Sequence, residues 1–189
     1  MAVRDITITG HRALHQPTKK VREVTDEIRE LVRDMFDTME AAEGVGLAAN
    51  QVGIRLRLFV YDCPGPDEAH YRGVVINPVL ERLGTPGALD EDLDGEGCLS
   101  VPGEYFPLAR HPQARVTGTD LDGNLVELAG EDLFARCLQH ETEHLDGTLY
   151  VDRLTGQWKR EAREAIKDRG WVNDGTTKWD PATTKAEDV

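Results

Sequence analysis

The sequence predicts one α+β domain, in which a mostly antiparallel sheet packs around a central helix that carries an H-E-x-x-H motif. Three observations lead to this prediction: strand patterns dominate the middle of the 189-residue chain, helix patterns lie towards both ends, and a strong hairpin signal separates two of the strands. With 39% hydrophobic and 30% charged residues, a chain of this length is able to bury a core of its own.

The first predicted helix covers residues 25–43. Its apolar residues recur at the i, i+3, i+4, i+7 spacing of one helical face, and they are Ile28, Leu31, Val32, Met35, Phe36 and Met39. Thr25 suits the N-cap, and Gly44 suits the position just beyond the last turn. Small residues bounded by glycines follow at 44–53.

Short apolar or alternating runs predict the strands. The predicted strands cover residues 56–60, 73–77, 79–83, 114–120 and 124–128. Residues 62–66 are expected to turn, and Asp122-Gly123 predicts a hairpin between the last two strands. Residues 85–97 are expected to form a loop whose acidic side chains are mostly solvated, and these are Asp90, Glu91, Asp92, Asp94 and Glu96.

Two more helices are predicted in the C-terminal part of the chain. They cover residues 131–146, which stop before Gly147, and residues 157–169, which stop before Gly170. The sequence beyond them is polar. We therefore expect a single catalytic domain at 1–170 and a poorly ordered tail at 171–189.

The overall charge and composition exclude several classes of protein. Acidic residues outnumber basic ones by 35 to 22, which gives a net charge of −13 and argues against bulk binding to nucleic acid. No apolar run is long enough to span a membrane, and the N-terminal residues lack the pattern of a signal peptide. Three cysteines do not make a disulfide framework. We expect a cytoplasmic protein that does not bind membranes.

The most specific feature is the H-E-x-x-H motif formed by His140, Glu141 and His144. Histidines four residues apart lie on one helical face, so both imidazoles are able to bind the same metal. Glu141 is then placed to act as a general base beside the metal. The same helix carries apolar residues such as Leu133 and Leu138, which indicates that it is partly buried.

A catalytic metal of this kind needs a third protein ligand. A further histidine six residues beyond the motif is ruled out, because Tyr150 occupies that position. Glu164 has the spacing seen in thermolysin-like proteases, although its helix is rich in charge. Cys98 follows Gly97, which would let the backbone approach a metal closely, and the N–H of Leu99 would point into the same site. Both Glu164 and Cys98 remain candidates on this reasoning.

Three segments resemble the signature motifs of the peptide deformylases. They are GVGLAANQ at 44–51, EGCLS at 96–100 and QHETEHLDG at 139–147. Their order and spacing also fit, and the resemblance extends from about residue 6 to about residue 170. The sequence departs from the family pattern at Glu143, where aspartate is common, and in the acidic insertion at 85–95.

The resemblance implies a hydrolase that removes the formyl group from the N-terminal formylmethionine of nascent polypeptides. It implies one divalent metal, with Fe²⁺ as the native ion and Zn²⁺, Ni²⁺ or Co²⁺ accepted in preparation. The implied metal ligands are Cys98, His140 and His144. Glu141 would be the general acid/base, while the side chain of Gln51 and the backbone N–H of Leu99 would form the oxyanion hole.

The methionine side chain is apolar, so we expect a pocket lined by Val45, Leu133 and Cys137 together with part of Leu99. Backbone groups of a glycine-flanked turn are able to pair with an extended peptide. That role is expected for the glycines of the first two motifs, which are Gly44, Gly46 and Gly97.

Other interpretations remain open at this point. Helix 157–169 is net basic, which favours either a solvated surface or a contact with ribosomal RNA near the emerging substrate. A small zinc endopeptidase that uses Glu164 is the alternative enzyme. A non-catalytic metal-binding or ribosome-associated protein is the alternative from another class.

Overall fold

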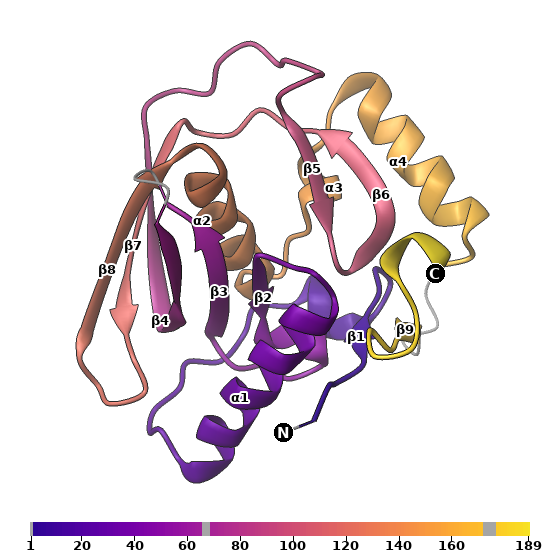
Figure 1. The fold of residues 1–189 in the computed structure, drawn as a ribbon. Coiled ribbons are helices and arrows are strands. Elements are labelled where there is room, and N and C mark those ends of the chain that lie inside the picture. The colour runs from indigo at the N-terminus through magenta and orange to yellow at the C-terminus, as the bar shows by residue number, and fades with distance from the viewer. Residues whose placement is uncertain (1, 66–68, 172–176) are drawn as a thin grey trace.

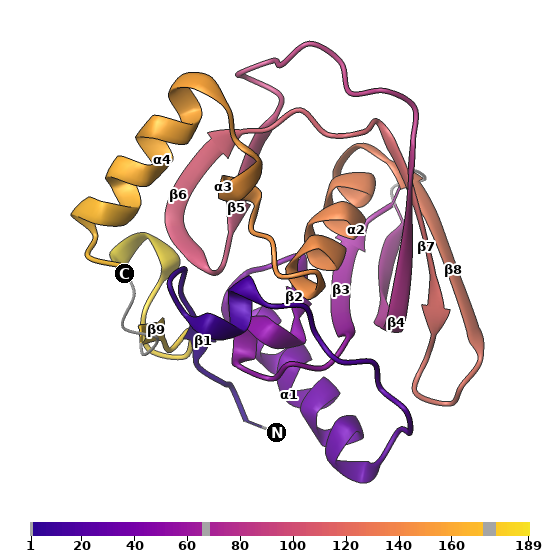
Figure 2. The same cartoon turned by 180° about the vertical axis from the view of Figure 1, so that it is seen from behind.

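The computed structural model describes residues 2–65, 69–171 and 177–189, and it confirms an α+β fold with antiparallel sheets (Figures 1 and 2). Its helices are α1 (Asp26–Ala41), α2 (Asp132–Leu145), α3 (Tyr150–Arg153) and α4 (Gly156–Asp168), with short 3₁₀ turns η1 (Arg12–His15), η2 (Ala49–Val52) and η3 (Ala186–Asp188). Its strands are β1 (Ile6–Thr7), β2 (Gly46–Ala48), β3 (Leu58–Pro64), β4 (His70–Leu83), β5 (Gly95–Cys98), β6 (Val101–Pro107), β7 (Gln113–Thr119), β8 (Leu125–Glu131) and β9 (Lys178–Trp179).

The main sheet has the strand order β2-β3-β4-β7-β8, and all neighbouring strands are antiparallel. The predicted hairpin at Asp122-Gly123 is confirmed, because Thr119 of β7 pairs with Leu125 of β8 around that turn. Gly123 has φ 82°, a left-handed conformation that glycine adopts without strain. Strands β5 and β6 form a separate hairpin whose tight turn contains Leu99 and Ser100.

Helix α2 lies across one face of the main sheet and α1 lies near the opposite face (Figures 1 and 2). Side chains alternate along β3, so Phe59 packs in a cluster with Phe134 and Leu138 of α2, while Val60 joins the cluster that contains Met35 of α1. Strand β3 is therefore buried on both faces, whereas β8 exposes alternate residues, and the helix with the H-E-x-x-H motif lies inside the molecule.

Several local predictions differ from the structure. The turn expected at 62–66 does not begin at Asp62, because β3 continues to Pro64; residues 66–68 lie outside the described residues. The strands expected on either side of Pro78 are one continuous strand, β4, with an irregularity in its pairing between Ile76 and Val79. Asn77 turns the strand there with φ 54°, and its side chain bonds both backbone groups of Val21. Asparagine tolerates this conformation well, so a bulge replaces the predicted break.

The end of α1 also differs from the prediction, although the helix itself is confirmed. Glu43, not Gly44, adopts the left-handed conformation after the helix, with φ 56°. A Cβ added at Gly44 would lie 2.8 Å from Leu99 Cδ1. Gly44 therefore lies against the Leu99 side chain, a contact that the sequence pattern did not reveal.

The described part of the C-terminal tail is packed against the domain, in contrast to the poorly ordered tail that we expected. Strand β9 pairs with β1, Trp179 is buried, and η3 packs beside β6 (Figure 1). Two tryptophans, Trp171 and Trp179, supply the apolar surface that holds this segment in the larger core cluster. Residues 172–176 of the tail lie outside the described residues. Among the helices of the described residues, none is long and apolar enough to span a bilayer.

Candidate metal centre and active site

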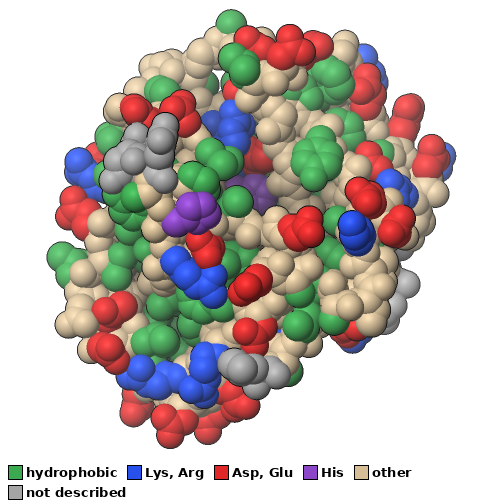
Figure 3. Space-filling model, viewed as in Figure 1, with side chains coloured by type: hydrophobic (Ala, Val, Ile, Leu, Met, Phe, Trp, Pro, Cys, Tyr) green, Lys and Arg blue, Asp and Glu red, His purple; other side chains and the backbone are tan. Residues whose placement is uncertain are grey.

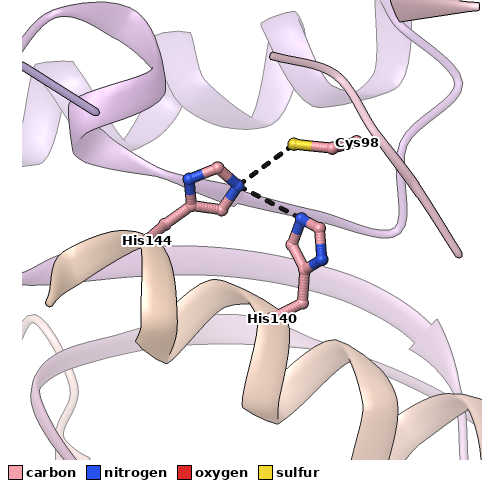
Figure 4. Close-up of side chains that lie close together, drawn as sticks. All are labelled: Cys98, His140 and His144. Carbon is pink, nitrogen blue, oxygen red and sulfur yellow. Dashed lines mark hydrogen bonds between the residues drawn. The ribbon is translucent and has the colours of Figure 1, made fainter. Parts of the chain in front are cut away.

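Three side chains from two elements meet beside the central helix (Figure 4). His140 and His144 lie one turn apart on α2, and their Nε2 atoms are 3.1 Å from each other. Cys98 at the end of β5 brings its Sγ atom to 3.2 Å from His144 Nε2. The ligand atoms of the three residues all lie within 4.8 Å of one another.

This group fits a divalent metal. Metal–nitrogen distances of ~2.0–2.1 Å and a metal–sulfur distance of ~2.3 Å place ligand atoms of a tetrahedral site ~3.3–3.6 Å apart, close to the spacing seen here. Two imidazoles and one thiolate also suit several first-row ions. In addition, Glu141 Oε2 is buried and has no hydrogen-bond partner among the described residues, as expected for an oxygen that serves a group bound beside the ligands.

Glu96 supports His140 from behind. Its Oε1 atom lies 2.7 Å from His140 Nδ1, which leaves Nε2 facing the metal group. Arg110 donates two hydrogen bonds to the same carboxylate at 2.9 and 2.6 Å, and Arg136 donates a third at 3.2 Å. Burial raises the pKa of Glu96, but hydrogen bonds from Arg110 and His140 outweigh burial and hold the pKa well below its usual value.

The expectation of a mostly solvated acidic loop holds for Asp90, Glu91 and Asp92, which are exposed, but it is wrong for Glu96. Glu96 is only 5% exposed and β5 begins at Gly95, so the last residues of the predicted loop belong to a strand. Asp94 is also paired, with Arg136 at 2.6 Å. The position of Glu96 directly before Gly97-Cys98 is the sequence feature that could have identified it.

We expect Glu96→Gln to weaken metal binding about 10- to 100-fold, the usual cost of losing a carboxylate behind a ligand histidine. An amide cannot provide the charged acceptor that fixes His140. Competition between the folded variant and a metal chelator measures the affinity. Glu104→Gln is the matched control, because Glu104 pairs with Arg169 at the cleft rim and does not contact His140. Equal affinity in both variants would contradict this role.

Glu141 lies beside the metal group and is 4% exposed. A Cβ added at Gly46 would come within 2.5 Å of Glu141 Oε1, so only glycine on β2 leaves room for this carboxylate. Burial raises the pKa of Glu141 to about 7, although the charge of His140 opposes the rise. A carboxyl with this pKa is able to both accept and release a proton near neutral pH.

Gln51 presents its amide nitrogen to the site. The backbone N–H of Ala48 donates to Gln51 Oε1 at 2.8 Å, which fixes the orientation of the amide. As a result, Nε2 points towards Cys98 Sγ at 3.9 Å. The neighbouring Asn50 donates to the carbonyl oxygen of His144 at 2.5 Å and so ties the first motif to the end of α2.

The site opens into a cleft of about 340 Å³. Figure 3 shows this face of the molecule hollowed near its centre, with histidine at the floor of the hollow and hydrophobic side chains around it. Apart from His144 and the alternative ligand Glu164, the site residues predicted from the sequence line the cleft: Gly44, Val45, Gly46, Gln51, Gly97, Cys98, Leu99, Leu133, Cys137, His140 and Glu141. Sequence reasoning missed the rim residues Glu43, Glu104 and Tyr105, and it missed Ala186 from the tail.

Two further acidic residues, Glu143 and Glu164, do not belong to the metal group. Glu143 is buried and accepts ion pairs from three arginines, which are Arg82, Arg110 and Arg153. Arg110 also donates hydrogen bonds to Glu96, so Glu143 belongs to the same network of ion pairs that holds Glu96 beside His140. Glu164 is exposed on α4, and the metal-ligand group found in the described residues does not include it.

Comparisons with known proteins agree with this geometry. The family model described as polypeptide deformylase matches residues 3–160. The peptide deformylase of Rhodococcus opacus is 56% identical over 190 residues, covering 98% of this chain and 96% of the relative. That of Mycolicibacterium smegmatis is 54% identical over 189 residues, covering 96% and 95%.

Solved structures show the same similarity. A peptide deformylase from Legionella pneumophila superposes with a TM-score of 0.78 at 37% identity, covering 90% of this chain and 96% of that one. A peptide deformylase from Synechococcus elongatus, solved in complex with actinonin, has a TM-score of 0.75 at 40% identity, covering 92% and 89%.

Proposed function

Because the chain belongs to the polypeptide deformylase family, we propose that Cys98, His140 and His144 hold one divalent metal in the active site of a hydrolase. The enzyme removes the formyl group from the amino terminus of nascent peptides. One observation carries the proposed site: the three ligand atoms, the carboxylate of Glu141 and the amide of Gln51 lie together at one cleft.

When bound, the metal lowers the pKa of a coordinated water molecule from about 16 towards 7. The carboxylate of Glu141 would accept a proton from the attacking water and would later pass it to the amine nitrogen that leaves. The raised pKa of Glu141, about 7, suits both transfers.

Two donors serve the formyl oxygen as negative charge develops on it. Gln51 Nε2 is oriented by the Ala48 N–H, and the backbone N–H of Leu99 belongs to the tight turn after Cys98. Such donors are already in place before the reaction, so no reorganisation is needed when charge appears. Removing one of them typically lowers the rate by about 10²–10³.

The cleft also offers contacts for the methionine side chain and the peptide backbone of the substrate. Val45, Leu133 and Cys137 provide apolar surface for the methionine side chain. A formylated amino terminus is neutral, so the pocket needs no counter-charge. The backbone at Gly44 and Gly46 is available to pair with the extended peptide.

Release of formate from formyl-Met-Ala tests the proposed function. The metal-loaded protein is expected to deformylate this substrate and to leave an internal peptide bond of equal length intact, with actinonin blocking the reaction. Cleavage of the internal peptide without formate release would instead favour an endopeptidase. Metal binding without either activity would favour a non-catalytic protein.

We propose Fe²⁺ as the native metal and predict that the iron form loses activity in air while the Ni²⁺ form keeps it. A ferrous centre reacts with oxygen, and the adjacent thiolate of Cys98 is placed to be oxidised, which destroys a ligand. Ni²⁺ has no comparable reaction under mild conditions. Anaerobic loading, admission of air and an assay over hours measure the decay, and mass spectrometry of the Cys98 peptide detects added oxygen. Equal decay of the two forms would contradict the prediction.

We also propose that the protein acts in the cytoplasm and that α4 contacts ribosomal RNA. Ala162 is buried against the domain, whereas Arg160, Arg163 and Lys167 are exposed on the same helix. Exchange of Arg160 and Arg163 for glutamate should weaken co-sedimentation with ribosomes and leave release of formate from a short peptide unchanged. Unchanged co-sedimentation would remove α4 from this role.

A further inference from the structure

The C-terminal segment reaches the turn that carries the metal thiolate. Trp179 of β9 is 5% exposed, and its indole Nε1–H donates a hydrogen bond to the carbonyl oxygen of Leu99 at 2.9 Å. Pairing of Trp179 with Ile6 of β1 holds the indole in place. The contact therefore joins residues 80 positions apart along the chain.

The peptide group that accepts this hydrogen bond also donates one. The carbonyl of Leu99 and the N–H of Ser100 belong to the same peptide unit, and the Ser100 N–H points to Cys98 Sγ at 3.4 Å. The carbonyl of Ser100 in turn accepts from the N–H of Thr9 at 2.8 Å. The turn after Cys98 is thus held by the N-terminal and the C-terminal segments together.

Hydrogen bonds in such a chain polarise one another. An acceptor bond at the Leu99 carbonyl makes the N–H of the same peptide a stronger donor. That donor faces the sulfur of Cys98, and hydrogen bonds to a ligand sulfur tune the metal that it binds. The same turn sets the direction of the Leu99 N–H, the proposed donor to the formyl oxygen.

We propose that Trp179 is a positioning residue of the active site, which acts through the Leu99–Ser100 peptide on the Cys98 thiolate and on the oxyanion donor. The inference rests on the proposed function of Cys98 and Leu99. It makes the last residues of the chain part of the active-site structure, in keeping with Ala186, which lines the same cleft.

The test compares Trp179→Phe with Trp171→Phe, each loaded with Co²⁺. Trp171 is a second buried tryptophan in the same core cluster, so its variant controls for lost packing. Trp179→Phe should keep one metal per chain and move the thiolate-to-cobalt charge-transfer band to longer wavelength, because a weaker hydrogen bond leaves the sulfur a stronger electron donor. Its kcat should fall about 3- to 10-fold, the worth of one hydrogen bond, with KM unchanged.

A second variant separates the hydrogen bond from the shape of the side chain. It places 3-benzothienylalanine at position 179, a residue that has sulfur where the indole has N–H. The same spectral shift is expected. A variant spectrum that superposes on that of the wild type, or an equal shift in Trp171→Phe, would overturn the inference. Deformylation by the wild-type protein would still support the proposed function in that case. Absence of wild-type deformylation would refute the function itself.

Discussion

Glu141→Gln is expected to retain the metal and to lose nearly all turnover. The ligand set of Cys98, His140 and His144 is unchanged, but an amide accepts no proton from water. General acid–base catalysis contributes about 10²–10⁴ in rate, so kcat should fall by that factor.

Metal analysis and formate release measured on the same samples check this expectation. Glu164→Gln provides the control, because Glu164 is exposed on α4 and lies outside the metal group found in the described residues. The control should keep both its metal and its kcat. Retention of more than about a tenth of kcat by Glu141→Gln would remove Glu141 from the proton transfer.

Cys98→Ala is expected to lose the metal, whereas Glu164→Ala is expected to keep it. Cys98 Sγ lies 3.2 Å from His144 Nε2, while Glu164 is exposed on α4. With only two imidazoles left, the site lacks the third protein ligand that catalytic metals of this kind have. Metal content after dialysis measures the difference. The reverse outcome would identify a protease-like site and refute the proposed ligand set.

Long periodic segments were the predictable part of the fold. Helices α1, α2 and α4 and the β7–β8 hairpin follow the sequence pattern within a few residues, because each contains its own caps, apolar face or turn residues. Strands β1, β2 and β9 have two or three residues each, too few to show a period. Their existence depends on a partner far along the chain, as in the pairing of Ile6 with Trp179.

The metal group itself followed from the motifs, but the residues that support it did not. The i, i+4 spacing of His140 and His144 determines their geometry on any helix. Glu96 was predicted to lie in a polar loop with other acidic residues, although it directly precedes Gly97-Cys98, and its burial beside Arg110 shows its role. The contact of Trp179 with Leu99 depends on tertiary packing, so no local sequence pattern predicts it.

The central claim is that Cys98, His140 and His144 bind the metal, and X-ray absorption of the Zn²⁺-loaded protein tests it most directly. The account predicts a coordination shell with one sulfur at about 2.3 Å and two imidazole nitrogens at about 2.0–2.1 Å. A shell of nitrogen and oxygen atoms alone in the wild-type protein would contradict it.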